Sequence, residues 1–197
     1  GSVYVEREQA GAAEIETALA RAVEAQQDWR ERDVAERCRL CSAMVDAFVA
    51  RRDQHAEELC WQMGRPISQG SGEIGGFEER ARAMIAMAPE ALAPLRLADK
   101  PGFPRYIRRE PLGVSLIVAP WNFPYMTAVN AVVPAILAGN AVILKHSAQT
   151  PLCAERMVEA AREAGIPEGV FQYLHLSHQA TETLMGDPRI DHVSFTG

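Results

Sequence analysis

The 197-residue sequence has no cluster of basic residues. Its 20 Lys and Arg against 26 Asp and Glu give a formal net charge of −6, and the isoelectric point is near 5.4. Proteins that bind nucleic acid or anionic membranes through electrostatics usually carry a basic patch. The composition therefore argues against a nucleic-acid or membrane-surface partner.

The sequence also lacks long apolar runs and a cysteine framework. No run approaches the roughly 20 apolar residues that span a bilayer, and no signal peptide is recognisable at the start. The four cysteines, Cys38, Cys41, Cys60 and Cys153, do not have the spacing of a small disulfide-rich domain. We therefore expect free thiols and a cytoplasmic protein.

Cys38 and Cys41 form one C-x-x-C pair, which raises a metal site as an alternative. A structural zinc site needs a second pair of ligands, whereas this pair lies inside an apolar helical pattern. The histidines of the second half are too scattered to complete it. The sequence predicts no metal site and places both cysteines on a buried helix face.

The first half of the sequence has the periodicity of amphipathic helices. An apolar stripe predicts one helix from about residue 12 to Trp29. Asp33, followed by Glu36, predicts the capped start of a second helix, and Asp53 predicts the cap of a third. A short strand is expected at residues 3–5.

Glycines interrupt this helical pattern at residues 70–76. We expect them to loosen the chain before a further helix over about residues 77–88. The carboxylates of Glu73, Glu78 and Glu79 are assigned to a solvated face, with acid or base chemistry as the alternative.

An excursion separates the two halves of the sequence. Prolines recur over residues 89–111, and residues 105–109 alternate as an exposed or edge strand does. We expect this excursion to pair with another subunit. The predicted division is a helical segment over residues 1–98, a hairpin or linker over 99–111 and an α/β segment over 112–197.

The second half alternates strands with helices. Apolar runs predict strands at residues 114–119, 141–145, 170–174 and 192–195. Helical patterns lie between them at residues 125–137, 151–164 and 179–185. Such alternation gives parallel strands joined by right-handed crossovers, so the expected fold class is α/β.

Ligands of parallel sheets bind beyond the carboxyl ends of the strands. The polar residues in that place include Asn122, Lys145 and Thr196. Asn122 has either of two roles: its amide donates to a developing oxyanion, or it caps the helix that begins near Pro124. Lys145 either binds ribose hydroxyls or a phosphate, or is simply exposed. Trp121 walls a nucleotide pocket or belongs to the core, which we favour from these residues alone.

A series of motifs covers nearly the whole chain in order. The motifs are Trp29-Arg30, Met63-Gly64-Arg65-Pro66, Arg109-Glu110-Pro111-Leu112-Gly113-Val114, Pro120-Trp121-Asn122-Phe123-Pro124, Ala138-Gly139-Asn140-Ala141-Val142-Ile143-Leu144-Lys145, Gln149-Thr150-Pro151, Gly165-Ile166-Pro167-Glu168-Gly169-Val170 and Phe195-Thr196-Gly197. In order and spacing they resemble the aldehyde dehydrogenase superfamily. The resemblance implies N-terminal helices followed by the first part of a Rossmann-like parallel sheet, and a hairpin that joins subunits.

The resemblance also implies roles for residues at the strand ends. Asn122 matches the side-chain donor of the oxyanion hole, and Lys145 matches the lysine that holds the adenosine ribose. The cofactor-binding residues expected on this basis are Ala119, Pro120, Trp121, Lys145, Ser147, Ala148, Thr196 and Gly197.

Departures from the family pattern bear on the cofactor. Ala148 stands where the family often has a glutamate that accepts from both ribose hydroxyls and repels a 2′-phosphate. The sequence therefore predicts that NADP is accepted, with NAD as the alternative. His146 replaces a proline and could add a donor near a phosphate. The turn over residues 176–179 lacks the glycine that is usual in the family. Without it, we do not expect the backbone of this turn to approach the dinucleotide closely.

The implied reaction is oxidation of a small aldehyde, such as a semialdehyde, through attack by a cysteine thiolate and hydrolysis by a glutamate-activated water. In the family both residues lie downstream of the Phe-Thr-Gly motif. We therefore expect a truncated N-terminal part that is inactive alone, and we assign Cys153 to helix packing. The full-length enzyme to which this part would belong, the parent, is expected to be a homodimer or homotetramer.

Two other hypotheses remain open. Within the enzyme class, the parent could form an acyl-CoA by thiolysis. From a different class, the chain could be a non-catalytic nucleotide-binding or subunit-interaction module. The sequence does not identify the aldehyde.

Overall fold

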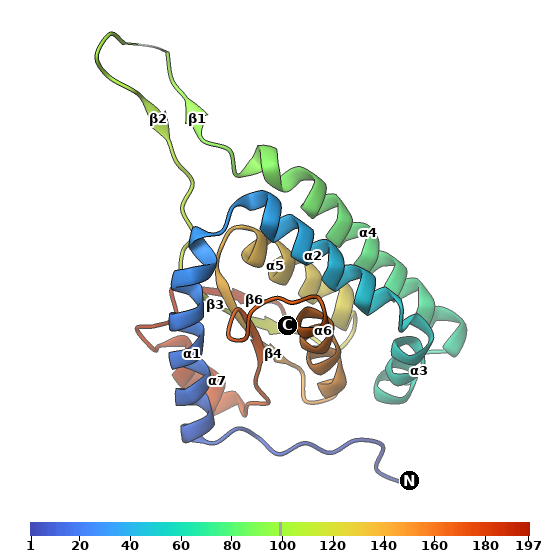
Figure 1. Ribbon diagram of the computed structural model, residues 1–197. Helices are drawn as coiled ribbons and strands as arrows, with labels where there is room; N and C mark the ends of the chain where they lie inside the picture. Colours follow the sequence, from blue (N-terminus) through green and yellow to red (C-terminus); the bar gives the residue numbers. More distant parts are fainter. Residues whose placement is uncertain (99) are drawn as a thin grey trace.

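The computed structural model describes residues 1–98 and 100–197 (Figure 1). Its helices are α1 (Ala12–Glu31), α2 (Val34–Val49), α3 (Arg52–Met63), α4 (Ile67–Ala91), α5 (Pro124–Leu137), α6 (Pro151–Glu163) and α7 (His178–Met185). Its strands are β1 (Leu95–Arg96), β2 (Tyr106–Ile107), β3 (Val114–Ala119), β4 (Ala141–His146), β5 (Phe171–Tyr173) and β6 (His192–Phe195). Among the described residues, no helix combines the length and apolar character needed to cross a bilayer.

The parallel sheet has the strand order β5-β4-β3-β6. Every residue of β3 and β4 is buried, as expected for central strands with helices on both faces. Successive side chains point to opposite faces: Leu116 packs with α1 and α7, whereas Ile117 packs with α5 and α6. The α/β fold class predicted from the sequence is confirmed.

The N-terminal helices share a core with the sheet. Helices α2 and α4 pack over α5 and α6 (Figure 1). The buried Trp29 donates from Nε1 to the Ile136 carbonyl at 2.9 Å, and Arg37 donates from Nε to the Leu137 carbonyl at 2.8 Å. The Leu137 carbonyl is one of the last carbonyls of α5, which have no partner within the helix, and the Ile136 carbonyl also accepts from the Gly139 amide at 3.0 Å. Gly139, with φ of +95°, then turns the chain out of α5.

Most predicted boundaries agree with the structure to within a residue or two, but two N-terminal expectations are wrong. Residues 3–5 form no strand; instead Tyr4 stacks on Trp61, with ring centroids 5.4 Å apart. Asp53 is not a cap, because α3 already begins at Arg52. Asp53 lies in the first turn, where a carboxylate still interacts favourably with the helix dipole.

The expected loose stretch at residues 70–76 is also wrong, because α4 runs through it without a break. A Cβ on Gly70 would lie 2.9 Å from the Ala56 carbonyl oxygen, so the glycine lets α4 pack closely on α3. Glu73, assigned to a solvated face from the sequence, is buried. A helical period carried through the glycines would have placed it inward.

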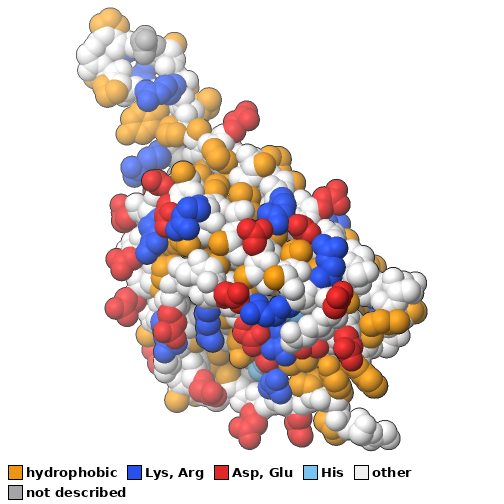
Figure 2. Space-filling view, turned by 45° about the vertical axis from the view of Figure 1, so that its right-hand side comes forward, with side chains coloured by type: hydrophobic (Ala, Val, Ile, Leu, Met, Phe, Trp, Pro, Cys, Tyr) orange, Lys and Arg blue, Asp and Glu red, His pale blue; other side chains and the backbone are white. Residues whose placement is uncertain are grey.

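The predicted excursion is a two-stranded antiparallel hairpin that protrudes from the body (Figure 1). Its paired residues begin at Leu95, before the boundary expected at residue 99, and Asp99 itself lies outside the described residues. Strand β1 is only two residues long, and the division of the chain at residues 98 and 111 stays a prediction. Apolar side chains, among them Phe103 and Ile107, are exposed on the hairpin (Figure 2).

Candidate cofactor and active site

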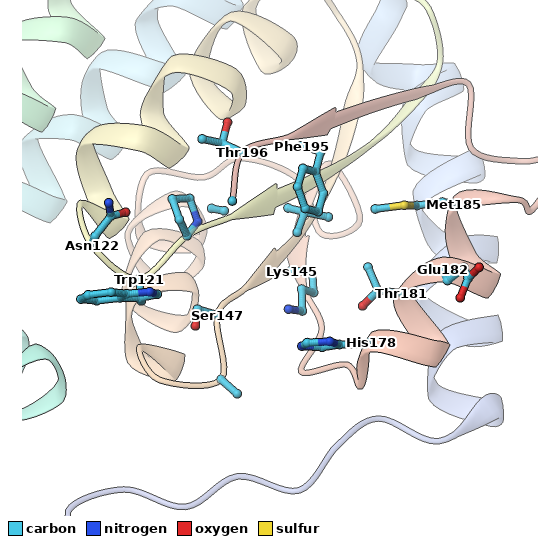
Figure 3. A pocket seen from close by; sticks show the side chains of 15 residues that line it. Trp121, Asn122, Lys145, Ser147, His178, Thr181, Glu182, Met185, Phe195 and Thr196 are labelled. Carbon is cyan, nitrogen blue, oxygen red and sulfur yellow. The ribbon is translucent and has the colours of Figure 1, made fainter.

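A cavity of about 600 Å³ opens at the carboxyl ends of β3, β4 and β6 (Figure 3). It is lined by Val118, Ala119, Pro120, Trp121, Asn122, Lys145, Ser147, Ala148, His178, Thr181, Glu182, Met185, Phe195, Thr196 and Gly197. All nine residues that the sequence proposed for catalysis or cofactor binding are among them. The structure thus brings three loops, separate in the sequence, around one space.

The loop after β3 presents Trp121 and Asn122 at one end of the cavity (Figure 3). The core assignment of Trp121 is wrong, since 47% of the residue is exposed. The capping alternative for Asn122 is not supported, because Phe123 occupies the N-cap position of α5 and no side-chain cap bond is formed there. The Asn122 amide is therefore available as a donor to a ligand.

Lys145 approaches the cavity from the end of β4. It is only 8% exposed, so the expectation of a simply exposed lysine is wrong. Burial lowers the pKa of its ammonium group, and within residues 1–98 and 100–197 it forms no ion pair. A partly desolvated cation without a carboxylate partner favours a ligand that offers anionic or hydroxyl oxygens.

His146 does not contribute to the cavity, which corrects the expectation of a donor near a phosphate. The residue is 2% exposed and contacts the Pro124 carbonyl at 3.2 Å and Thr150 Oγ1 at 3.1 Å. Burial lowers its pKa to about 4, so the ring is neutral at pH 7. Its Nε2–H then donates to the Pro124 carbonyl, which ties the end of β4 to the start of α5.

Helix α7 supplies cavity residues that sequence reasoning missed, namely His178, Thr181, Glu182 and Met185. Because β5 pairs with β4, α7 begins at the same edge of the sheet as the other loops. Thr181, Glu182 and Met185 lie at the end of the cavity away from Asn122 (Figure 3). The signal that could have identified these side chains is the strand order, which places the start of α7 at the cavity edge.

None of the four cysteines lines the cavity. Cys153, the one considered as a nucleophile, is buried in α6, and burial raises its pKa well above the ordinary value. Such a thiol is inert at pH 7. In the described part of the chain, no group of three or more His, Cys, Asp or Glu side chains is arranged to hold a metal ion.

The lining fits a nicotinamide dinucleotide. Lys145 provides a cation for ribose or phosphate oxygens, and Trp121, on the same loop as Asn122, provides an exposed planar face. Ser147 and Thr196 add hydroxyl groups at neighbouring strand ends. A mostly apolar cavity with a few convergent polar groups is the usual form of such sites.

The chain is similar to known aldehyde dehydrogenases in sequence and in structure. It is 35% identical to an NADP(+) succinate-semialdehyde dehydrogenase 1 of Mycobacterium tuberculosis (strain ATCC 25618 / H37Rv), over 93% of the chain and 41% of that protein. The solved NAD-dependent aldehyde dehydrogenase of Sinorhizobium meliloti is 36% identical, with a TM-score of 0.89 over 96% of the chain and 38% of that structure. The succinic semialdehyde dehydrogenase of Streptococcus pyogenes, solved with NADP+, is 26% identical, with a TM-score of 0.88 over 96% of the chain and 42% of that structure.

The chain thus spans about 40% of the length of these relatives. The sequence profile described as "Aldehyde dehydrogenase family" matches residues 1–197. That match covers every motif noted in the sequence and every loop that lines the cavity. The chain belongs to the aldehyde dehydrogenase family.

Proposed function

We propose that the full-length protein containing this chain oxidises a small aldehyde to the carboxylic acid with NADP or NAD. The observation that carries the proposal is the convergence of Asn122 and Lys145 on one cavity from the ends of adjacent strands. One is a neutral donor suited to a developing oxyanion and the other a cation suited to the cofactor.

In this proposal Asn122 donates its side-chain N–H to the oxygen of the aldehyde as a thiolate adds to the carbonyl carbon. Because none of the four cysteines of this chain lines the cavity, we expect the thiolate and the base that activates water to come from residues outside these 197. When bound, the cofactor supplies the acceptor for the substrate hydride.

The proposed cofactor-binding residues are those of the three strand ends. Ala119 is the last residue of β3, and Pro120 and Trp121 follow it. Lys145 lies at the end of β4, with Ser147 and Ala148 after it, and Thr196 and Gly197 follow β6. Ala148 carries no charge that would repel a 2′-phosphate, which supports the use of NADP. The names of the Mycobacterium and Streptococcus relatives, which include NADP, support the same choice.

We further propose a semialdehyde as the substrate, since two of the compared relatives are named succinate or succinic semialdehyde dehydrogenases. The protruding hairpin, with exposed Phe103 and Ile107, supports a contact with a second subunit in a homodimer or homotetramer. The free thiols support a cytoplasmic location.

The test is an assay of the full-length protein with succinate semialdehyde and either NADP or NAD, following absorbance of the reduced nicotinamide, with and without coenzyme A. Reduction that needs only aldehyde and nucleotide supports hydrolytic oxidation. Reduction that requires coenzyme A would assign the protein to acyl-CoA formation instead. No reduction with a panel of small aldehydes, together with intact nucleotide binding, would contradict the proposed activity.

A further inference from the structure

A buried ion pair lies behind the Asn122 loop and lines no part of the cavity. Arg65 Nη1 donates to Glu73 Oε2, from the turn before α4 to the second turn of that helix. The Glu73 side chain is fully buried, and the Arg65 side chain is 13% exposed. Burying two charges is costly unless further hydrogen bonds satisfy them.

In the part of the chain that the structure describes, the other hydrogen bonds of this pair and its cation–π contact lead to one short segment. Glu73 Oε1 accepts from the Tyr125 amide at 2.9 Å and from the Met126 amide at 3.5 Å. Arg65 Nη2 donates to the Asn122 carbonyl at 2.9 Å, and its guanidinium carbon lies 4.8 Å from the centre of the Phe123 ring. Three hydrogen bonds and one cation–π contact, to residues 122, 123, 125 and 126, hold the backbone on which the Asn122 side chain stands.

The carboxylate of Glu73 occupies the place of a helix cap. The first amides of a helix have no partner within the helix, and a negative charge is favourable beside them. At the start of α5 this charge comes from Glu73 on α4, across the helix interface, and no side chain of the adjoining loop caps the helix. Phe123, at the N-cap position, has no side-chain acceptor, so capping of α5 does not draw on the Asn122 side chain, whose amide is kept for a ligand.

Arg65 acts on the other side of the same loop. Because it holds the Asn122 carbonyl, the peptide after Asn122 cannot rotate freely, and the cation over the Phe123 ring resists displacement of the following residue. Burial raises the pKa of Glu73 while the Arg65 charge opposes that rise. Burial of the Glu73 carboxylate therefore costs free energy, and the groups that offset this cost are Arg65 and the backbone amides at the start of α5.

We propose that Arg65 and Glu73 are positioning residues that aim the Asn122 side chain at the reacting oxygen. Glu73 caps α5 where the N-cap residue, Phe123, has no acceptor, and Arg65 fixes the peptide after Asn122. The proposal rests on the proposed function for its catalytic consequence, but the positioning itself is a property of this chain and is measurable without turnover.

The first experiment measures order parameters of the Asn122 backbone and side-chain amides by NMR in the 197-residue chain. The wild-type backbone value is expected near 0.85, and Arg65→Ala is expected to lower it below about 0.6. Arg52→Ala is the matched control, because Arg52 also pairs with a glutamate of α4, Glu78, but within the described residues forms no hydrogen bond or ion pair with the loop. Unchanged order in Arg65→Ala would overturn the proposal. If Arg65→Ala does not fold, Glu73→Gln and Arg65→Lys carry the same comparison.

The second experiment is a double-mutant cycle for kcat in the full-length protein. Arg65→Ala is expected to lower kcat about tenfold, part of the 10²–10³-fold loss typical of deleting an oxyanion donor, with the dissociation constant for NADP unchanged. In an Asn122→Ala background the same change is expected to alter kcat less than about twofold, because its target is gone. Arg65→Lys is expected to recover part of the loss.

The outcomes separate the two proposals. An equal loss in both backgrounds would show that Arg65 acts by a general structural effect and would overturn the positioning role. Absence of aldehyde oxidation by the wild type, with disorder at Asn122 in Arg65→Ala, would defeat the proposed function and leave the positioning role standing.

Discussion

The two ends of the cavity are held in different ways. Lys145 is placed by strand register, since β4 runs beside β3 and delivers its last residues to the sheet edge. Asn122 stands on a loop that is fixed from outside the sheet, by Arg65 and Glu73, which precede it by 57 and 49 residues in the sequence. A side chain at a strand end is aimed by local periodicity, whereas a side chain on a turn needs contacts from distant helices.

Glu73→Ala is expected to have the largest effect on stability, because it removes the carboxylate that holds the Asn122 end of the cavity. It leaves the Arg65 charge without its partner and the Tyr125 amide uncapped, and breaking a buried pair in this way costs about 3–5 kcal/mol. Urea unfolding of the two proteins measures the difference. Glu78→Ala, which removes a partly exposed carboxylate of the same helix, is expected to cost about 1 kcal/mol or less. Equal losses would show that burial of Glu73 is not what stabilises this region.

Asn122→Ala tests the same end through chemistry. In the full-length protein we expect kcat to fall about 10²–10³-fold while nucleotide affinity is kept, because only the donor to the oxyanion is removed. Asn130→Ala is the matched control, since Asn130 is exposed on α5 and lies outside the cavity lining. Steady-state kinetics with separate nucleotide titrations measures both quantities. A loss confined to nucleotide affinity would assign Asn122 to the cofactor.

The pH dependence of stability probes the link between the two ends. His146 has a pKa of about 4 in the folded state against 6.5 for the ordinary group. The unfolded chain therefore binds the proton first as pH falls, so stability present above pH 6.5 is lost between about pH 6.5 and 4. Down to pH 5 this loss amounts to about 2 kcal/mol for one histidine.

We expect His146→Gln to show a correspondingly flatter profile in urea unfolding between about pH 6.5 and 5. Some dependence remains, because His55 is also buried with its pKa lowered to about 4. His192→Gln, at an exposed position on β6, keeps both buried histidines and serves as the control. An unchanged slope in His146→Gln would contradict the neutral, hydrogen-bonded state described for this ring.

Ala148→Glu gives the smallest expected effect and tests cofactor preference at the end of the cavity that contains Lys145. A carboxylate at this position would accept from the two ribose hydroxyls and repel a 2′-phosphate, so we expect NADP affinity to fall about tenfold relative to NAD. Parallel titrations of the two nucleotides measure the ratio. Ala148→Gln, which adds similar length without charge, is the control. A ratio that moves equally in both variants would attribute the effect to bulk.

The four strands of the parallel sheet and the helices between them could be predicted from the sequence, because apolar periodicity is a local property. The nine proposed site residues came from the strand-end rule and from the family resemblance; all nine line the cavity, and their roles stay predictions. It did not predict the role of Glu73, which depends on a continuous α4 packed against α5. The glycines at residues 70–76 were expected to interrupt the helix. Instead, Gly70 lets α4 approach Ala56 of α3 closely. The side chains of α7 were missed for a related reason, since their place follows from the pairing of β5 with β4.

Nucleotide titration of the 197-residue chain tests the central claim most directly. Trp121 is exposed at the cavity and Trp29 is buried, so tryptophan emission in a Trp61→Phe background reports on Trp121. We expect NADP to change this emission at saturating concentrations. Lys145→Ala is expected to weaken binding about 10–100-fold, as for a hydrogen bond to a charged group, and Asn122→Ala is expected to leave it unchanged. Equal binding by the wild type and Lys145→Ala, or no binding of either nucleotide, would contradict a cofactor site at this cavity.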